Sequence, residues 1–217
     1  PYVVIALIGN AIPFYLITWG QQVVESALAG ILMAFMPLST LVLAHFLIAG
    51  EGMTRNRALG FAAGFCGIVL LMGPDALAGL GGDTLRIVSQ LSVLGGALCY
   101  ALQSVLTRLI IRGDVIVSAA STLLVASLVV VPAALWLDRP WLLEPRAVSA
   151  AAVVWLGVIP TAVATVLYFQ LIRSAGPSFM SLVNYLSPGV AVMLGLWIMG
   201  EQPQATAYAG LALILSG

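Results

Sequence analysis

Polar and aromatic side chains recur at helical spacing inside long apolar runs of this sequence. Residues at positions i, i+3, i+4 and i+7 lie on one face of a helix, so each set forms a stripe. The stripes are Asn10, Phe14, Thr18 and Gln21, with Tyr15, Trp19 and Gln22 beside them; Tyr100, Gln103, Ser104 and Thr107; Thr161, Thr165 and Tyr168; and Ser181, Asn184, Tyr185 and Pro188. Amide, hydroxyl and ring groups of this kind can hold a small zwitterionic or polar-aromatic solute without any charged side chain.

The apolar setting of the stripes suggests a solute pathway. In hydrocarbon, polar side chains face the interior of a helix bundle or a water-filled cavity. The predicted pathway lining consists of Thr18, Trp19, Gln22, Met33, Pro37, Tyr100, Gln103, Ser104, Thr165, Tyr168, Ser181, Asn184 and Tyr185. The alternative is that these side chains only hydrogen-bond across helix interfaces, which is common for such residues in membranes. Composition alone leaves both interpretations open.

No acidic residue lies in the middle of any apolar run. Glu51 and Glu201 each follow a glycine at the end of a run, where an acid can stabilise a helix N-terminus, so we assign them a structural role. Proton coupling is left open. Pro37 and Pro188 each remove a backbone hydrogen bond inside a run, which predicts a kink or a freed carbonyl. We treat Glu51, Glu201 and Pro188 as structural signature residues, and we expect no metal and no cofactor.

The composition excludes several classes of protein. Of 217 residues, 62% are hydrophobic and 7% are charged, whereas soluble domains carry about 25% charged residues. There is no Lys, so the chain has no lysine for a retinal Schiff base, and no basic patch for nucleic acid. The expected partners are therefore the lipid bilayer and a small-molecule substrate.

Charged residues punctuate the chain at the spacing of a bilayer. A membrane-spanning helix needs about 17–25 apolar residues, which is the length of most of the uncharged runs. The predicted helices are about 2–24, 26–49, 54–73, 92–112, 116–137, 149–172, 178–199 and 205–217. The runs lack strict alternation and are too long for barrel strands. We therefore predict an all-α polytopic membrane protein.

A long-period repeat relates the two parts of the chain. PLSTLVLAHFLIAGE (37–51) returns as PGVAVMLGLWIMGE (188–201), and glycines follow both copies at matching distances. With loops on alternating sides, one side holds five arginines and the other three, so the positive-inside rule makes the first side cytoplasmic. The arginines of the first side are Arg55, Arg57, Arg108, Arg112 and Arg173, and those of the second are Arg86, Arg139 and Arg146. Glu51 and Glu201 then fall on opposite sides, which predicts an inverted repeat of the kind found in secondary transporters.

The repeat defines the expected organisation of the chain. Residues 1–76 hold the last three helices of a first repeat, 77–91 form a linker, and 92–217 hold a second repeat of five helices with the last incomplete. The natural completion is an inverted five-plus-five repeat, of which about eight helices are present here, with two helices expected before Pro1.

These features resemble the EamA family of the drug/metabolite transporter superfamily. Residues 13–74 are similar to the third to fifth helices of the family, and GGALCYALQSVLTR (95–108) is similar to its sixth. The resemblance implies a multi-pass transporter of the bacterial inner membrane, monomeric or homodimeric, that exports amino acids or related metabolites by alternating access. Drugs and nucleobase-type compounds are alternative substrates. An intramembrane enzyme or a channel is less compatible, since the sequence has neither a Gly-x-Ser-x-Gly motif nor a filter loop.

Overall fold

The computed structural model describes residues 1–137, 139, 142, 146–194, 197–198 and 205–216. The helical elements are α1 (Tyr2–Ala6), η1 (Leu7–Ala11), α2 (Ile12–Gly20), α3 (Ser26–Met33), α4 (Phe35–Leu47), α5 (Arg55–Met72), η2 (Pro74–Gly79), α6 (Thr84–Ile110), α7 (Val115–Leu137), α8 (Ala147–Leu156), η4 (Gly157–Thr161), α9 (Ala162–Ala175), α10 (Pro177–Ser181), α11 (Val183–Leu194) and α12 (Ala205–Ser216). Within these residues, seven helical segments are long and apolar enough to span a membrane, and α12 is a shorter apolar helix. The prediction of an all-α polytopic membrane protein is confirmed.

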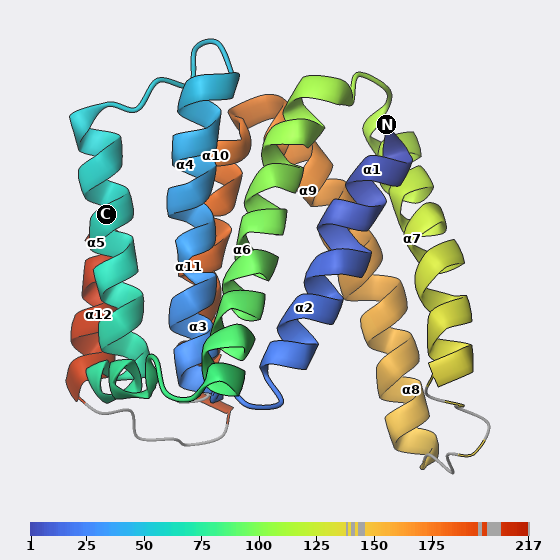
Figure 1. The fold of residues 1–217 in the computed structure, drawn as a ribbon. Coiled ribbons are helices and arrows are strands. Elements are labelled where there is room, and N and C mark those ends of the chain that lie inside the picture. Colours follow the sequence, from blue (N-terminus) through green and yellow to red (C-terminus); the bar gives the residue numbers. More distant parts are fainter. Residues whose placement is uncertain (138, 140–141, 143–145, 195–196, 199–204, 217) are drawn as a thin grey trace.

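The two repeats run in opposite directions through the bundle. Figure 1 shows α4 and α5 meeting at the upper end of the molecule, whereas α11 ends and α12 begins at the lower end. The equivalent helix pairs are therefore inverted. Glu51 lies in the upper connection, and its predicted counterpart Glu201 lies outside the described residues.

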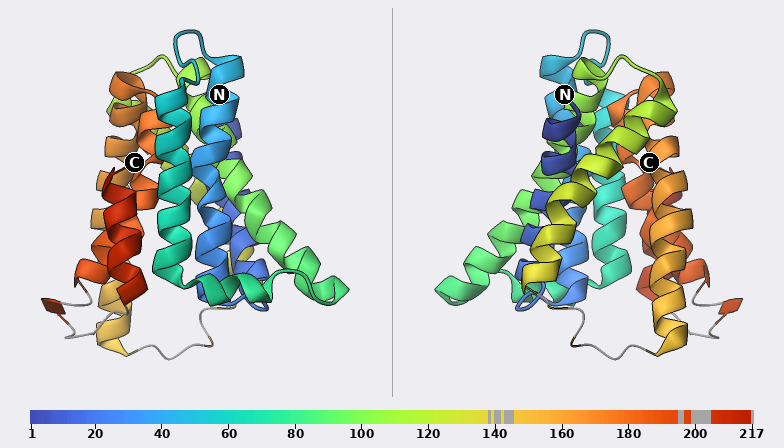
Figure 2. Two further views of the ribbon diagram at one scale, coloured as in Figure 1. Left: turned by 90° about the vertical axis from the view of Figure 1, so that its left-hand side faces the viewer. Right: turned by 90° about the vertical axis from the view of Figure 1, so that its right-hand side faces the viewer.

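The inverted pair α5 and α12 pack directly against each other, and the left view of Figure 2 shows them side by side. A Cβ atom at Gly67 would lie 2.8 Å from the carbonyl oxygen of Gly210, and one at Gly210 would lie 2.6 Å from that of Gly67. Two glycines are therefore needed for the helices to approach this closely. The adjacent apolar cluster comprises Ala34, Leu41, Phe61, Ile68, Tyr185 and Ile214, so both repeats contribute to one core.

The helix predicted over 92–112 begins earlier and corrects the predicted linker. It starts at Thr84, where the Asp83 carboxylate accepts a hydrogen bond of 2.9 Å from the backbone N–H of Arg86. This cap satisfies a free N–H of the first turn. Residues 84–91 of the predicted linker 77–91 therefore belong to α6, whose early turns lean away from the bundle in Figure 2. The single charge of Arg86 is not enough to end the helix.

Four predicted continuous helices are interrupted. The run 2–24 contains the π-helical segment η1 between α1 and α2. The run 26–49 divides at Ala34 into α3 and α4, and the run 178–199 divides at Leu182 into α10 and α11. Each break lies shortly before a proline, Pro37 or Pro188, which cannot donate to the carbonyl four residues earlier. The run 149–172 contains the π-helical segment η4, which includes Pro160. A proline lies in or near each interruption, but Pro132 lies inside α7 without interrupting it, so proline alone does not decide where a helix breaks.

Candidate functional site

A central cavity of about 400 Å³ lies between helices of both repeats. Every side chain on its wall is uncharged. The lining residues are Gly9, Asn10, Phe14, Met33, Met36, Tyr100, Gln103, Thr122, Thr161, Ala164, Thr165, Tyr168, Phe169, Met180 and Asn184. Amides and hydroxyls on this wall can hydrogen-bond a polar solute, while thioethers and rings can contact its apolar part.

The structure brings six residues of the predicted lining to this cavity. They come from four elements and are Met33, Tyr100, Gln103, Thr165, Tyr168 and Asn184. Three further members of the polar stripes, Asn10, Phe14 and Thr161, line it as well. Helices far apart in the sequence therefore present their polar faces to one space.

Three predicted residues at the end of the first span lie away from the cavity. Thr18 is exposed, and its hydroxyl donates a hydrogen bond of 2.7 Å to the Phe14 carbonyl. Trp19 is half-buried, and Gln22 is exposed beyond the end of α2. The stripe of Asn10 and Phe14 reaches the cavity but ends before Thr18, and the adjacent stripe of Tyr15, Trp19 and Gln22 does not line the cavity.

Four other predicted residues are packed within the protein instead of lining the cavity. Ser104 and Ser181 are fully buried, and their hydroxyls donate to carbonyls of their own helices, those of Ala101 and Ser178. Pro37 is also fully buried, within α4. The sequence left open whether the two serines line the pathway or pack between helices. Their contacts fit the packing role.

Tyr185 is the fourth packed residue and connects the repeats. Its hydroxyl donates a 3.3 Å hydrogen bond to the Ala34 carbonyl, at the break between α3 and α4. Its ring lies over Gly64, where a Cβ atom would come within 2.4 Å of the ring, and packs edge to face on Phe61. Tyr185 therefore supports the wall from behind.

Two π-helical segments flank the cavity, a feature that the sequence analysis missed. The segments η1 and η4 begin at Leu7 and Gly157, which are separated by 150 residues, as are Glu51 and Glu201. They contribute Asn10 and Thr161 to the cavity wall. Single π-turns inside α-helices occur frequently at functional sites. Aligning the two repeats residue by residue was the signal that could have located one segment from the other.

Gly9, in η1, allows a glutamine to reach the cavity wall. A Cβ atom at this position would lie 2.0 Å from Cδ of Gln103. The side chain of Gln103, which is 8% exposed, therefore lies directly over the Gly9 backbone. Any larger residue at position 9 would displace the amide.

Two cavity-lining residues carry buried hydroxyls with no hydrogen-bond partner in the described part of the chain. They are Thr122 and Tyr168. Buried polar atoms in proteins are nearly always paired, so unpaired ones require an explanation such as water or a bound molecule. Both oxygen atoms are themselves covered, so they belong to the packed layer of the wall and not to its open surface. Within the described residues, no three His, Cys, Asp or Glu side chains gather as a metal site would need.

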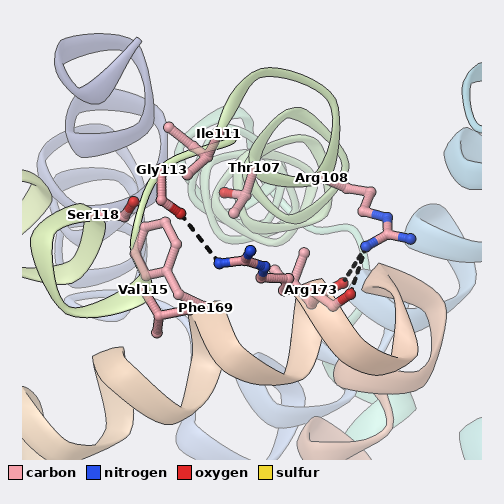
Figure 3. A pocket seen from close by; sticks show the side chains of 9 residues that line it. Thr107, Arg108, Ile111, Gly113, Val115, Ser118, Phe169 and Arg173 are labelled. Carbon is pink, nitrogen blue, oxygen red and sulfur yellow. Dashed lines mark hydrogen bonds between the residues drawn. The ribbon is translucent and has the colours of Figure 1, made fainter.

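Arginines fasten the helices at the upper end of the molecule. As Figure 3 shows, Arg108 of α6 donates to the carbonyls of Ile172, at 3.3 Å, and of Arg173, at 2.6 Å, in the last turn of α9. Arg173 in turn donates to the carbonyl of Gly113, at 3.3 Å. Cations favour helix C-termini, where carbonyls lack helical partners. The ends of α6 and α9 are therefore held together.

Glu51 contacts the opposite repeat at the same end. Its carboxylate accepts hydrogen bonds from the hydroxyl of Ser178, at 2.5 Å, and from the Ser178 backbone N–H, at 3.3 Å. The sequence predicts that Glu51 stabilises the N-terminus of a helix. It binds the N-terminal turn of α10, 127 residues away, whereas the next helix along the chain, α5, is capped by Thr54. A second cavity, of about 610 Å³, adjoins this contact and includes Arg57 and Arg108.

Comparison with known proteins agrees with this architecture. The chain is 26% identical over 195 residues to an uncharacterized inner membrane transporter, YedA, of Escherichia coli K12, covering 90% of this chain and 61% of that protein. It is 26% identical to a probable terminal-alkyne amino-acid exporter of Streptantibioticus cattleyicolor, covering 93% and 66%. It is 24% identical to the uncharacterized transporter YoaV of Bacillus subtilis, covering 100% and 73%.

A crystal structure of another protein shares the fold. Its TM-score is 0.79 at 21% identity, covering 99% of this chain and 74% of that one. The sequence model of the EamA-like transporter family matches residues 1–73 and 88–217, which is nearly the whole chain. The chain therefore belongs to the EamA-like transporter family.

Proposed function

We propose that this chain is part of a secondary transporter that moves amino acids or related small metabolites across the bacterial inner membrane. The observation that carries the proposal is the uncharged central cavity between two inverted repeats, flanked by their two equivalent π-helical segments. Inverted-repeat transporters bind their substrate at the interface of the repeats and open it to each side in turn. Net transport is proposed to be export, in keeping with the resemblance to metabolite exporters.

The lining supports a solute without net charge. Moving an ion out of water into an uncharged cavity is costly unless another charge compensates it. A zwitterion carries its own compensating charge, and the amides of Asn10, Gln103 and Asn184 offer donors and acceptors for both of its ends. An amino acid with a neutral side chain meets these conditions. The family and the amino-acid exporter among the relatives support the same solute class.

A second candidate is a larger apolar or aromatic solute, such as a drug or a nucleobase-type compound. The observation in its favour is the set of methionine and phenylalanine side chains on the cavity wall. These are Phe14, Met33, Met36, Phe169 and Met180. Methionine is flexible and adapts to irregular apolar ligands. This lining is compatible with aromatic solutes of either kind.

Counterflow in proteoliposomes tests the proposal. Vesicles loaded with one unlabelled solute are diluted into the same solute in labelled form, and uptake of label is measured against empty vesicles. We expect uptake with amino acids that have neutral side chains and little with those that have charged side chains. Exchange of aromatic drugs or nucleobases alone supports the second candidate. No exchange with any solute contradicts a transport function for the chain.

A further inference from the structure

The short helix α10 separates two cavities. Ser178, Phe179 and Leu182 line the upper cavity of about 610 Å³. Met180 of α10 and Asn184 of the first turn of α11 line the central cavity of about 400 Å³. Hence little more than one helical turn stands between the upper cavity and the proposed solute site.

The backbone on both sides of α10 departs from regular helix. Gly176, before it, has φ +89°, a conformation that L side chains rarely adopt. Leu182, after it, keeps helical dihedral angles (φ −61°, ψ −21°), but its N–H bonds the Phe179 carbonyl three residues earlier, and α10 and α11 are separated there by a turn. Hinges in proteins are a few such residues at the ends of elements, where changes in φ and ψ are absorbed. These two positions bound a segment of five residues, Pro177–Ser181, which packs against α4, α6 and α9.

The segments next to α10 are held in place. Arg108 binds the last carbonyls of α9, just before the first hinge. Tyr185 binds the Ala34 carbonyl just beyond the second hinge. Movement of the chain between residues 176 and 182 would leave both of these attachments intact.

Glu51 holds α10 itself. Its carboxylate binds the hydroxyl and the N–H of Ser178, which is 6% exposed. A Cβ atom at Gly176 would lie 2.1 Å from Oε1 of Glu51, so the carboxylate also fits closely against the hinge. Hydrogen bonds to a charged group are roughly twice as strong as those between neutral groups. This contact joins the first repeat to the second.

We propose that α10 is a gate between the two cavities and that Glu51 is the latch that keeps it closed. The upper cavity then becomes a vestibule leading to the central site from the arginine-rich side. Arg57 and Arg108 on its wall favour solutes that carry a carboxylate. The role of the gate in solute movement rests on the proposed function. The gate itself can be tested without any solute.

Labelling of a cysteine on the face of α10 that lines the central cavity tests the latch. Met180→Cys is made in a chain whose own Cys66 and Cys99 are replaced by alanine, and an impermeant thiol reagent is applied from the arginine-rich side of sealed vesicles. Glu51→Ala and Ser178→Ala should each raise the labelling rate about tenfold, equivalent to about 1.4 kcal/mol in the gate equilibrium. The double variant should label no faster than either single variant, because both remove the same contact.

Glu25→Ala is the matched control. Glu25 is an exposed acid next to a helix start, without a side-chain cap hydrogen bond, and its loss should leave labelling unchanged. Unchanged labelling in folded Glu51→Ala and Ser178→Ala overturns the gate. If Glu51→Ala does not fold, Ser178→Ala decides, since it deletes one hydroxyl only. Faster labelling combined with no solute exchange in any protein keeps the gate and rejects the transport function.

Discussion

The hydroxyl of Tyr185 donates a hydrogen bond to the carbonyl of Ala34, and these two residues occupy equivalent positions in the inverted repeats. They are 151 residues apart, the same separation as Pro37 and Pro188. Two equivalent positions can touch only near the axis that relates the repeats. The contact between Tyr185 and Ala34 therefore locates this axis, inside the apolar core shared by α4, α5, α11 and α12.

The cavity lies next to the same axis. Met33 and Asn184, also 151 residues apart, both line it. Pro37 and Pro188 cannot donate to the carbonyls of these two residues, because each stands four positions later and has no N–H. Each repeat thus supplies the same backbone position to the central site, although the side chains differ.

The position of Tyr185 predicts an effect on stability. Tyr185→Phe removes a hydrogen bond in a buried core and should lower the free energy of unfolding by about 1 kcal/mol. The midpoint of thermal unfolding in detergent is the measurement. Tyr15→Phe, at a residue 66% exposed, is the control and should have no effect. Equal midpoints for wild type and Tyr185→Phe would mean that the hydrogen bond does not hold the crossing together.

Gln103 is expected to act in transport and not in stability. Gln103→Ala removes an amide from the cavity wall and should reduce the rate of exchange at least about tenfold. This is the effect expected when a hydrogen bond to a charged end of the solute is lost. The amount of protein in the membrane should not change. Gln22→Ala, a glutamine outside the cavity, should exchange at the wild-type rate. The same loss in both variants would contradict the location of the site.

The sequence and the structure agree on the large features. Uncharged runs of bilayer length mark the spans, since charges are costly in hydrocarbon, and the Gly-Glu repeat marks the inversion. Periodicity also placed Tyr100, Gln103 and Thr165 on the correct faces. Polar residues inside lipid must face protein or water, which makes this prediction physically strong.

The parts that the sequence did not reveal depend on contacts between distant residues. Helical spacing cannot distinguish Asn184, which lines the cavity, from Tyr185, which lies behind it, because both are on the protein-facing side of α11. The two π-turns lie next to prolines, Pro13 and Pro160, but Pro132 lies inside α7 without such a turn, so a proline in the sequence does not by itself predict one. The pairing of Glu51 with Ser178 spans 127 residues and both repeats. It requires the three-dimensional arrangement.

Gly9 should be intolerant of any side chain. Gly9→Ala places a methyl group 2.0 Å from Cδ of Gln103, so the glutamine must leave its position and exchange should fall to the level of Gln103→Ala. Gly157→Ala is a matched control in the equivalent π-segment, since a Cβ atom there meets nothing within 4 Å. Initial rates of counterflow for the two variants give the comparison. A fully active Gly9→Ala would show that the amide of Gln103 is not needed where it lies.

The most direct test of the account is chemical blockade of the central cavity. Thr165→Cys is introduced without Cys66 and Cys99, and exchange is measured before and after complete modification by a charged thiol reagent. Thr18→Cys, exposed outside the cavity, is the control. We predict that modification at position 165 abolishes exchange, that excess solute slows this modification, and that modification at position 18 has neither effect. Full exchange by protein completely modified at position 165 would contradict passage of the solute through this cavity.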